Sequence, residues 1–312
     1  MRTLICGSIA YDNIMVFQGH FKDHILPDQV HILNVAFLVP HLRREFGGTA
    51  ANIAYNLRML GGEPVVMGTI GMIDGHTYRQ RFLDLEIDTT HVRVVPGAYT
   101  AQAFITTDLD DNQITAFHPG AMNSAHLNRV QDARDIKLAI VSPDGKEGML
   151  QHCQQLADAN IPFIFDPGQG LPMFNGSELT EMVDHSSYVT LNDYEAKMLA
   201  EKSGLTVERL AQRVKAVVVT LGSKGSEIHA NGKVEHIPVV PAAKLVDPTG
   251  CGDAFRSGLL YGIANGMDWA TAGRLASLMG SIKIASEGGQ NHHAKREEIL
   301  ARFKTLFGYE IQ

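Results

Sequence analysis

Residues 246–255, VDPTGCGDAF, hold the densest group of side chains able to do chemistry. Gly250 and Gly252 surround Cys251 just before a predicted helix, and glycine lets an anion approach the backbone amides closely. A helix N-terminus adds free N–H groups and the positive end of its dipole, so this pattern is typical of a phosphate site. Asp253 stands where a carboxylate would take a proton from an attacking hydroxyl. The alternative is that Asp253 only caps the helix and the glycines only form a tight turn.

A second glycine pair occurs in residues 46–54, FGGTAANIA. Gly47 and Gly48 precede a run of small side chains and a predicted helix, so a ligand can lie against the backbone there. Asn52 can both donate and accept hydrogen bonds, which suits the hydroxyls of a sugar. The segment alone is weak evidence, because Gly-Gly-Thr is also a common way to start a helix.

Two further loops follow predicted strands, and ligands of open α/β sheets bind at the carboxyl ends of strands. Thr220, Gly222 and Gly225 belong to the loop after the most apolar strand. Asn192 and Glu195 follow another strand, where they are placed to hold the waters of a hydrated Mg²⁺ ion. The alternative for this pair is a capped helix start with Glu in its first turn.

Composition and missing motifs exclude several classes of function. The chain has 312 residues and a net charge of −7, and general nucleic-acid binding is not expected because it depends on neutralising phosphates. Three widely spaced cysteines indicate neither a disulfide framework nor a structural zinc site. The chain has no P-loop, no HExxH, no GxSxG, and no GxGxxG after the first strand. Without an apolar run of membrane-spanning length or a signal-peptide core, we expect a cytoplasmic protein with no membrane partner.

The elements that position these residues alternate between short apolar strands and helices, which favours βαβ units and a parallel sheet. The runs AVVVT and FIF are apolar throughout, as expected of strands covered on both faces. The predicted fold class is therefore α/β. The predicted strands are 4–6, 64–69, Leu138–Val141, Phe163–Phe165, 188–191 and Ala216–Thr220, and the predicted helices are 52–60, 77–85, 147–159, 254–264, 269–285 and Arg296–Phe307.

Two stretches, 14–46 and 92–118, break this alternation, and we expect them to form a small β lid on the α/β body. Ala101–Thr107 and Gln113–His118 flank a polar tip, as in a hairpin with a longer loop. The tip residues Asp108, Asp110 and Asp111 could be read as cation ligands. We interpret them instead as a solvated turn.

Together the four chemical segments resemble the ribokinase family, also called the phosphofructokinase-B (PfkB) family, and the resemblance covers nearly the whole chain. Residues 47–52 resemble its N-terminal signature, and residues 247–255 resemble its C-terminal signature, DTxGxGDxF. Asn192 and Glu195 match its NxxE motif, and residues 220–225 match its nucleotide loop. The resemblance implies one domain over 1–312, with a three-layer α/β/α body, a mainly parallel central sheet, and a small β lid from about 13–46 and 92–119.

By this resemblance the protein transfers a phosphoryl group from ATP to a sugar-type hydroxyl with Mg²⁺. Asp253 is then the catalytic base, and Asp12, after the first strand, matches the aspartate that binds the sugar hydroxyls. The resemblance assigns the anion hole to the amides of Gly250, Cys251 and Gly252, further sugar contacts to Gly47, Gly48 and Asn52, nucleotide binding to Asn192, Thr220, Gly222 and Gly225, and Mg²⁺ binding through water to Glu195.

Departures from the ribokinase pattern point to the adenosine and nucleoside kinase branch. Thr49 replaces the Lys of ribokinases, which counts against free ribose. The long N-terminal insertion and residues 117–122 resemble this branch, and Phe117 and Met122 would lie against a base. We therefore expect 5′-phosphorylation of a purine nucleoside in purine salvage, adenosine first, with inosine or guanosine as alternatives.

Two other functions stay open. One is a sugar kinase of the same family acting on fructose, ribose or a related sugar. The other is a non-catalytic nucleoside-binding regulator, against which the intact Asp253 and glycine turn argue. The oligomeric state is also open, with a homodimer through the lid as one arrangement.

The resemblance also includes a K⁺ site beside the anion hole. Asp247 and Thr249 match the first part of such a site, and the carbonyls of residues 286–290 would supply the second. A bound cation there would add positive potential near the transferred phosphate. The alternative is that Asp247 merely bonds turn amides before Pro248.

Overall fold

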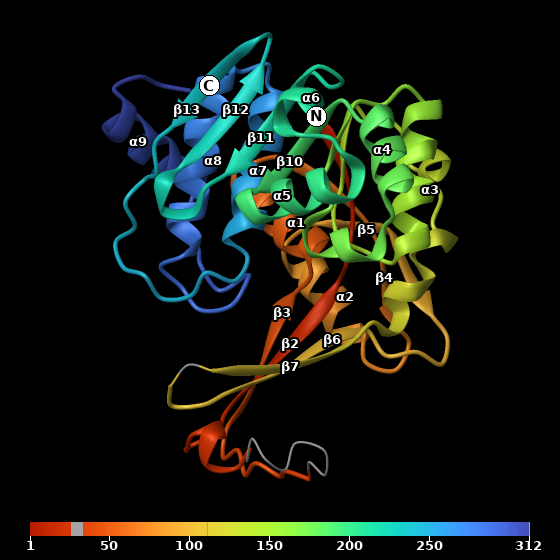
Figure 1. Cartoon of the computed structure of the whole chain (residues 1–312), viewed down its shortest axis with the longest axis vertical. Helices are drawn as coiled ribbons and strands as arrows, with labels where there is room; N and C mark the ends of the chain where they lie inside the picture. The colour runs from red at the N-terminus through yellow and green to blue at the C-terminus, as the bar shows by residue number, and fades with distance from the viewer. Residues whose placement is uncertain (26–33, 111, 312) are drawn as a thin grey trace.

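The central sheet has the strand order β13-β12-β11-β10-β9-β8-β1-β4-β5 (Figure 1). The computed structural model describes residues 1–25, 34–110 and 112–311. Neighbouring strands from β11 to β5 pair in parallel, whereas β12 and β13 are antiparallel additions at one edge. The strands are β1 (Arg2–Cys6), β4 (Glu63–Gly71), β5 (Asp88–Val95), β8 (Leu138–Val141), β9 (Phe163–Phe165), β10 (Tyr188–Asn192), β11 (Ala216–Thr220), β12 (Ser226–Ala230) and β13 (Lys233–Ile237).

Helices cover both faces of this sheet, because alternate side chains of each strand point to opposite faces. Ile5 and Val66 pack with α1 (Thr49–Met59), α2 (His76–Asp84), α7 (Cys251–Ala264), α8 (Trp269–Lys283) and α9 (Arg296–Phe307). Leu4 and Val65 pack with α3 (Lys146–Asp158), α4 (Gly176–His185), α5 (Asp193–Ser203) and α6 (Val207–Ala211). The predicted α/β/α body with a mainly parallel sheet is confirmed. Of the helices in the described ranges, none has the length and apolar character needed to cross a membrane.

The antiparallel edge of the sheet is an element that the sequence analysis missed. β12 and β13 are joined by Asn231 and Gly232 alone, with φ values of 52° and 70°. Two positive φ angles are typical of a type I′ hairpin turn, for which Asn-Gly is the preferred pair. The signal was therefore present in the sequence.

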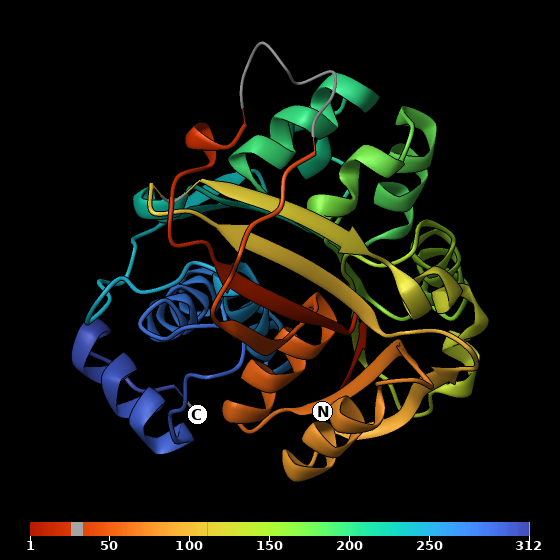
Figure 2. The same cartoon turned by 90° about the horizontal axis from the view of Figure 1, so that it is seen from below.

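The predicted lid is a second sheet with the order β3-β2-β6-β7. It projects from one end of the body (Figure 1) and crosses in front of the body when the molecule is seen from below (Figure 2). Its strands are β2 (Ala10–Val16), β3 (Leu42–Gly47), β6 (Ala101–Thr107) and β7 (Gln113–His118). The predicted hairpin is confirmed with the expected bounds, since β6 and β7 pair antiparallel.

The predicted lid boundaries of 13–46 and 92–119 need correction. The first part of the lid starts at Ala10, where β2 begins only three residues after the end of β1. The second part starts at Ala101, because residues 92–95 belong to β5 and pair with β4 in the central sheet. Residues 26–33 of the expected lid lie outside the described residues.

At the tip of the β6–β7 hairpin, Leu109 and Asp110 are exposed as predicted, but Asp108 is bonded to the segment after β2. Asp108 is buried, and its carboxylate accepts hydrogen bonds from the amides of Phe21, Asp110 and Asn112, at 2.9 to 3.0 Å. These bonds hold its pKa at about 2, although desolvation opposes them. The interpretation of Asp108 as a solvated turn residue is therefore wrong.

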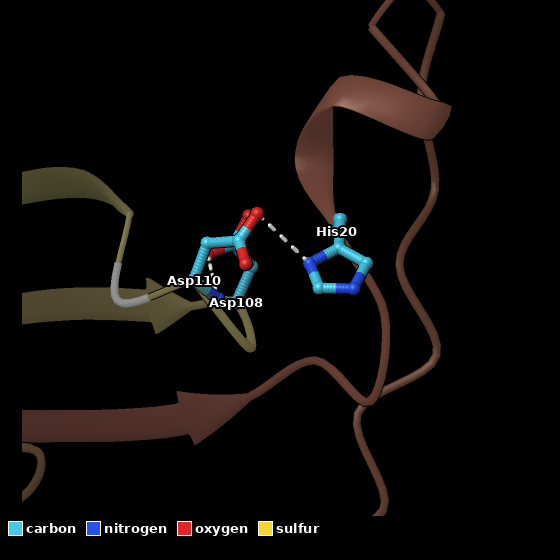
Figure 3. Close-up of side chains that lie close together, drawn as sticks. All are labelled: His20, Asp108 and Asp110. Carbon is cyan, nitrogen blue, oxygen red and sulfur yellow. Dashed lines mark hydrogen bonds and ion pairs between the residues drawn. The ribbon is translucent and has the colours of Figure 1, made fainter.

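Asp110 also has partners within the chain. Its Oδ2 pairs with His20 Nδ1 at 3.1 Å (Figure 3). The same oxygen pairs with Lys22 Nζ at 2.8 Å. Although donor atoms of His20, Asp108 and Asp110 lie within 4.8 Å of one another, the two carboxylates are already bonded by protein groups. These bonds favour a structural role at the lid tip over cation binding. Asp111 lies outside the described residues.

Candidate active site

The carboxylate of Asp253 lies at the head of α7 and is bonded to Asn52 on α1. Asn52 Nδ2 donates to Asp253 Oδ2 over 2.8 Å, and Asn52 Oδ1 accepts from Gln290 Nε2 over 3.2 Å. Gln290 therefore fixes which end of the Asn52 amide faces Asp253. Burial raises the pKa of Asp253 to about 6, although the Asn52 bond and the Arg256 charge lower it. A carboxylate with a pKa near this value is ionised at neutral pH and suited to general-base catalysis.

Gly250 turns the chain into α7 with φ at 76°, in the left-handed region that glycine tolerates. In the part of the chain that the structure describes, the amides of Gly250, Gly252 and Asp253 donate to no protein acceptor. The Cys251 amide, by contrast, donates to the Pro248 carbonyl over 3.1 Å. Two of the three amides expected in the anion hole are thus free, and so is the neighbouring amide of Asp253. Burial raises the pKa of the Cys251 thiol to about 11, which keeps it neutral.

A cavity of about 760 Å³ opens between lid and body, with Asp253 on its wall. This volume is within the usual range for small-molecule sites. Residues that the sequence placed in separate segments meet here. The predicted site residues on the wall are Asp12, Gly48, Asn52, Phe117, Met122, Thr249, Gly250 and Asp253.

Asp12 reaches this cavity from the lid strand β2. Gly47, which is paired with the start of β2, makes room for it, because a Cβ on Gly47 would lie 2.4 Å from Asp12 Oδ2. Burial, together with the charges of Asp247 and Glu45, raises the pKa of Asp12 to about 6. No donor among the described residues bonds the Asp12 carboxylate, so it is suited to accept hydrogen bonds from ligand hydroxyls.

Gly48 brings the start of α1 against the β1–β2 connection. Its φ is 88°, and a Cβ there would lie 2.6 Å from both the Ser8 carbonyl and the Ala10 nitrogen. The Thr49 amide donates to Ser8 Oγ over 3.1 Å, and the Thr49 hydroxyl donates to the Pro143 carbonyl over 3.1 Å. Thr49 therefore faces the backbone of the β8 end.

The far part of the cavity combines apolar and polar side chains. Phe117 comes from lid strand β7 and is half exposed, and Met122 comes from the 3₁₀ helix η3 (Gly120–Leu127). The two apolar side chains thus approach the ligand space from lid and body. Further polar residues on this wall were missed by the sequence analysis, namely Asn123, Asp144, Lys146 and Gln169.

Asp144 is the most unusual of these residues. It follows β8 and is buried, its Oδ1 accepts from the Gly145 amide over 2.9 Å, and its Oδ2 has no partner within the described residues. Burial raises its pKa to about 8. Its place directly after a strand end was the available sequence signal.

The expected nucleotide residues lie at neighbouring strand ends, away from the cavity wall. Asn192 ends β10 and Thr220 ends β11, and the two are register partners in the parallel pair. Gly222 and Gly225 have φ values of 58° and 89°, and the Leu221 amide closes the loop by donating to the Gly225 carbonyl over 2.8 Å. The topology therefore brings the NxxE motif and the glycine loop together.

Asn192 and Glu195 form a capping box at the start of α5. Asn192 Oδ1 accepts from the Glu195 amide over 2.7 Å, and Glu195 Oε2 accepts from the Asn192 amide over 2.8 Å. The capped helix start, which was the alternative to Mg²⁺ binding for this pair, is thus present. The side-chain oxygen of Asn192 serves the helix rather than pointing freely at a ligand.

A buried ion pair, missed by the sequence analysis, joins α7 to the end of β9. Arg256 Nη2 donates to Asp166 Oδ1 over 2.7 Å, and Arg256 Nη1 donates to the Gly252 carbonyl over 3.2 Å. Arg256 Nη2 also lies 4.0 Å from Glu195. The Asp-Pro-Gly after β9 and the Arg just after the glycine turn were the available signals.

Asp166, Glu195 and Asp253 place three carboxyl groups around the single guanidinium of Arg256. Burial raises the pKa of Glu195, and the Asp166 charge adds to the effect. Hard oxygen donors with a surplus of negative charge suit hydrated Mg²⁺. Protein groups already bond both Asp166 oxygens and one Glu195 oxygen, so these carboxylates fit the divalent ion expected from the sequence only through its bound waters.

The residues expected to hold K⁺ fit it poorly, because the oxygens of Asp247 and the Ser286 carbonyl are already bonded within the protein. The Asp247 carboxylate accepts from the Thr249 and Gly288 amides, each over 2.8 Å. Asp247 therefore bonds turn amides around Pro248, which was the alternative to K⁺ binding. The carbonyls of Asp247 and Ser286 accept from Lys283 Nζ over 2.7 and 3.1 Å.

Residues 13–296 match the pfkB family of carbohydrate kinases. The nucleoside kinase of Methanothermobacter thermautotrophicus is 30% identical over 97% of this chain and 99% of its own length. A structure of the Burkholderia thailandensis nucleoside kinase in complex with inosine shares 56% identity over 99% of each chain, with a TM-score of 0.90. Its complex with ADP-inosine shares 57% identity over 99% of this chain and 97% of that one, with a TM-score of 0.88.

The chain belongs to the pfkB, or ribokinase, family of carbohydrate kinases, and within it to the nucleoside kinase branch. This confirms the family and branch that the sequence motifs predicted.

Proposed function

We propose that the protein is an ATP-dependent kinase for the 5′-hydroxyl of a purine nucleoside. The observation that carries the proposal is the position of Asp253, bonded to Asn52, on a cavity wall shared with Asp12 and Phe117. One region of this cavity offers carboxylates to hydroxyl groups, and another offers apolar surface to a base. The similarity to two nucleoside kinases supports this choice of acceptor.

In the proposed reaction, Asp253 takes the proton from the 5′-hydroxyl as the hydroxyl oxygen attacks the γ-phosphorus, and the bond between that phosphorus and ADP breaks. The pKa of about 6 keeps the carboxylate ionised at neutral pH. The free amides of Gly250 and Gly252 and the positive end of the α7 dipole face the charge that builds on the transferred phosphoryl group. Catalysis is then mainly positioning and charge stabilisation, as in other phosphoryl transfers.

Asn192, Thr220, Gly222 and Gly225 are proposed to bind the nucleotide at the ends of β10 and β11. Glu195, through water, together with Asp166 would hold Mg²⁺. When bound, the ion neutralises part of the phosphate charge. Arg256 keeps the glycine turn in place through its bond to the Gly252 carbonyl.

For the acceptor, we propose that Asp12 binds ribose hydroxyls beside Gly47, Gly48 and Asn52, with Phe117 and Met122 against the purine. Adenosine is the first expected acceptor, and the inosine complex of the Burkholderia enzyme supports inosine beside it. The lid would exclude water from the reacting phosphate. On the strength of the family resemblance, we place the activity in purine salvage in the cytoplasm.

A homodimer through the lid is proposed as well. Leu42 on β3, Phe104 on β6 and Ile114 on β7 are exposed apolar residues of this sheet. A second copy packed on the lid would cover such surface. Light scattering at several protein concentrations measures the mass, and a monomer throughout would contradict the dimer.

The proposal is tested by initial rates of ADP formation from ATP and Mg²⁺ with a panel of nucleosides and sugars. We expect adenosine and inosine to give the highest kcat/KM. Higher values for fructose or ribose would assign a sugar kinase instead. Failure to form ADP with any acceptor of the panel, together with nucleoside binding measured by calorimetry, would assign a non-catalytic regulator.

A further inference from the structure

Lys283 is a wholly buried lysine at the last position of α8, with 0% of its surface exposed. Its Nζ donates to the carbonyls of Asp247 and Ser286 over 2.7 and 3.1 Å. A buried ammonium is costly unless it is bonded, and these carbonyl acceptors belong to two different loops. The side chain therefore joins the loop before α7 to the loop after α8.

Both of these loops reach the candidate active site. The first continues from Asp247 through Thr249, whose amide donates to the Asp247 carboxylate, to the left-handed Gly250. The second continues from Ser286 to Gln290, which bonds the Asn52 amide that faces Asp253. A change at Lys283 would move both the anion turn and the partner of the candidate base.

Other contacts hold Lys283 in this position. The Ile284 carbonyl, next in the chain, accepts from the amides of Val246 and Asp247 over 2.9 and 3.2 Å. α7 and α8 also pack closely, because a Cβ on Gly258 would lie 2.6 Å from Ala276 Cα. The ammonium is thus placed by a rigid helix pair.

We propose that the ammonium of Lys283 is the permanent cation of the anion turn, so that phosphoryl transfer needs no bound monovalent cation. It bonds carbonyls of the two segments from which the K⁺ ligands were expected, and its positive charge interacts with the carboxylates of Asp247 and Asp253. The proposal rests on the proposed kinase function. Lys283 acts as a positioning residue, since it bonds the loops rather than the ligand.

The first test compares initial rates with inosine and ATP in K⁺, Na⁺ and choline at constant ionic strength and saturating Mg²⁺. The wild type should give rates within about twofold of one another. Lys283→Ala, which vacates the space of the ammonium, should lose more than tenfold in choline and regain much of the loss in K⁺ or NH₄⁺. A several-fold gain of the wild type in K⁺, or full activity of Lys283→Ala in choline, would overturn the proposal.

Lys202→Ala is the matched control, because Lys202 Nζ also donates to two backbone carbonyls, those of Pro172 and Phe174. Its rates should not depend on the cation. Lys283→Gln keeps a donor without the charge, and it also serves if the alanine variant does not fold. Wild-type rates of Lys283→Gln in choline would contradict the need for a positive charge.

A melting-temperature measurement separates this inference from the proposed function, because it needs no acceptor. K⁺ should raise the melting temperature of Lys283→Ala above the value in choline, and it should leave the wild type and Lys283→Gln, whose side chain still fills the space, unchanged. Equal responses of Lys283→Ala and wild type would count against a cation position at Lys283. A wild type that phosphorylates no acceptor would refute the kinase proposal alone, while the melting result would still decide on Lys283.

Discussion

Asn52 Nδ2 donates to Asp253 Oδ2 over 2.8 Å, across 201 residues of sequence. The bond joins the first turns of α1 and α7, and each helix follows one of the two glycine signatures. It orients the candidate base and lowers its pKa against the effect of burial. The two signatures therefore build one site rather than two.

Replacing Asp253 by Asn should lower kcat by roughly 10²–10⁴, the usual range for the loss of a general base. The amide keeps the size of the side chain, so acceptor KM and melting temperature should change little. Asp158→Asn, at the exposed end of α3, is the control and should behave as wild type. Near-wild-type turnover of Asp253→Asn would remove this residue from its proposed role.

The pH dependence of kcat should show an acid limb near pH 6, because Asp253 must be ionised to accept a proton. Asn52→Ala removes a hydrogen bond that lowers this pKa, so the limb should move to higher pH. Rates measured from pH 5 to pH 9 at saturating substrates report the shift. A limb that stays in place or moves to lower pH would contradict the assigned bond.

Asp12→Ala should raise the KM of the nucleoside and leave the KM of ATP nearly unchanged. The wild type should also reject 2′- or 3′-deoxynucleosides, since a buried site that reads a hydroxyl is left with unpaired groups when the hydroxyl is missing. Steady-state kinetics with ribose and deoxyribose nucleosides measure both effects. Equal kcat/KM values for the two classes would argue against Asp12 as the hydroxyl ligand.

Gly250→Ala and Gly204→Ala form a matched pair, since their φ angles are 76° and 73°. Each substitution should cost roughly 1–2 kcal/mol of stability from left-handed strain. At Gly250 the added Cβ would also lie 3.3 Å from Gly289 and 3.4 Å from Asn52, whereas Gly204 has open space around it. Activity should fall only for Gly250→Ala, and equal activities of the two variants would contradict an active turn at Gly250.

The free energy of unfolding should fall between pH 4 and pH 8 because of Asp144. Its pKa is about 8 in the folded chain and about 3.9 unfolded, so the folded state holds a proton that the unfolded state releases. The contribution of Asp144 to the free energy of unfolding is fully present below about pH 4. It falls as the pH rises and is lost once the pH passes about 8. The slope is about 1.4 kcal/mol per pH unit for one such group.

Asp144→Asn should remove this slope, and Asp158→Asn should leave it. Urea titrations at one-unit pH intervals measure the difference. Identical slopes for wild type and Asp144→Asn would contradict the buried, protonated state of Asp144.

The parallel body could be predicted from the sequence because each of its strands is an apolar run followed by a turn or helix signal. In β11, Val218 packs on one helical layer, and Val217 and Val219 pack on the other. Successive residues of this strand are therefore all apolar. The start of the lid was harder to locate, because β2 follows β1 with no helix between them. Only the packing of Gly48 against Ser8 and Ala10 shows where the chain leaves the body.

The glycine turns and acidic residues of the site could be found from local patterns, but their partners could not. Lys283 lies in an apolar helical run, and its bond to Asp247 crosses 36 residues of sequence. The pair of Asp166 and Arg256 crosses 90 residues. Such contacts depend on tertiary structure, so no local pattern favoured Lys283 over a bound K⁺ ion.

The central claim is tested most directly by the product formed from ATP, Mg²⁺ and adenosine or inosine. Separation of the products by chromatography with mass detection should show the nucleoside 5′-monophosphate in step with ADP, and almost none with Asp253→Asn. ADP without a nucleoside monophosphate, or a phosphorylated sugar as the preferred product, would contradict the account.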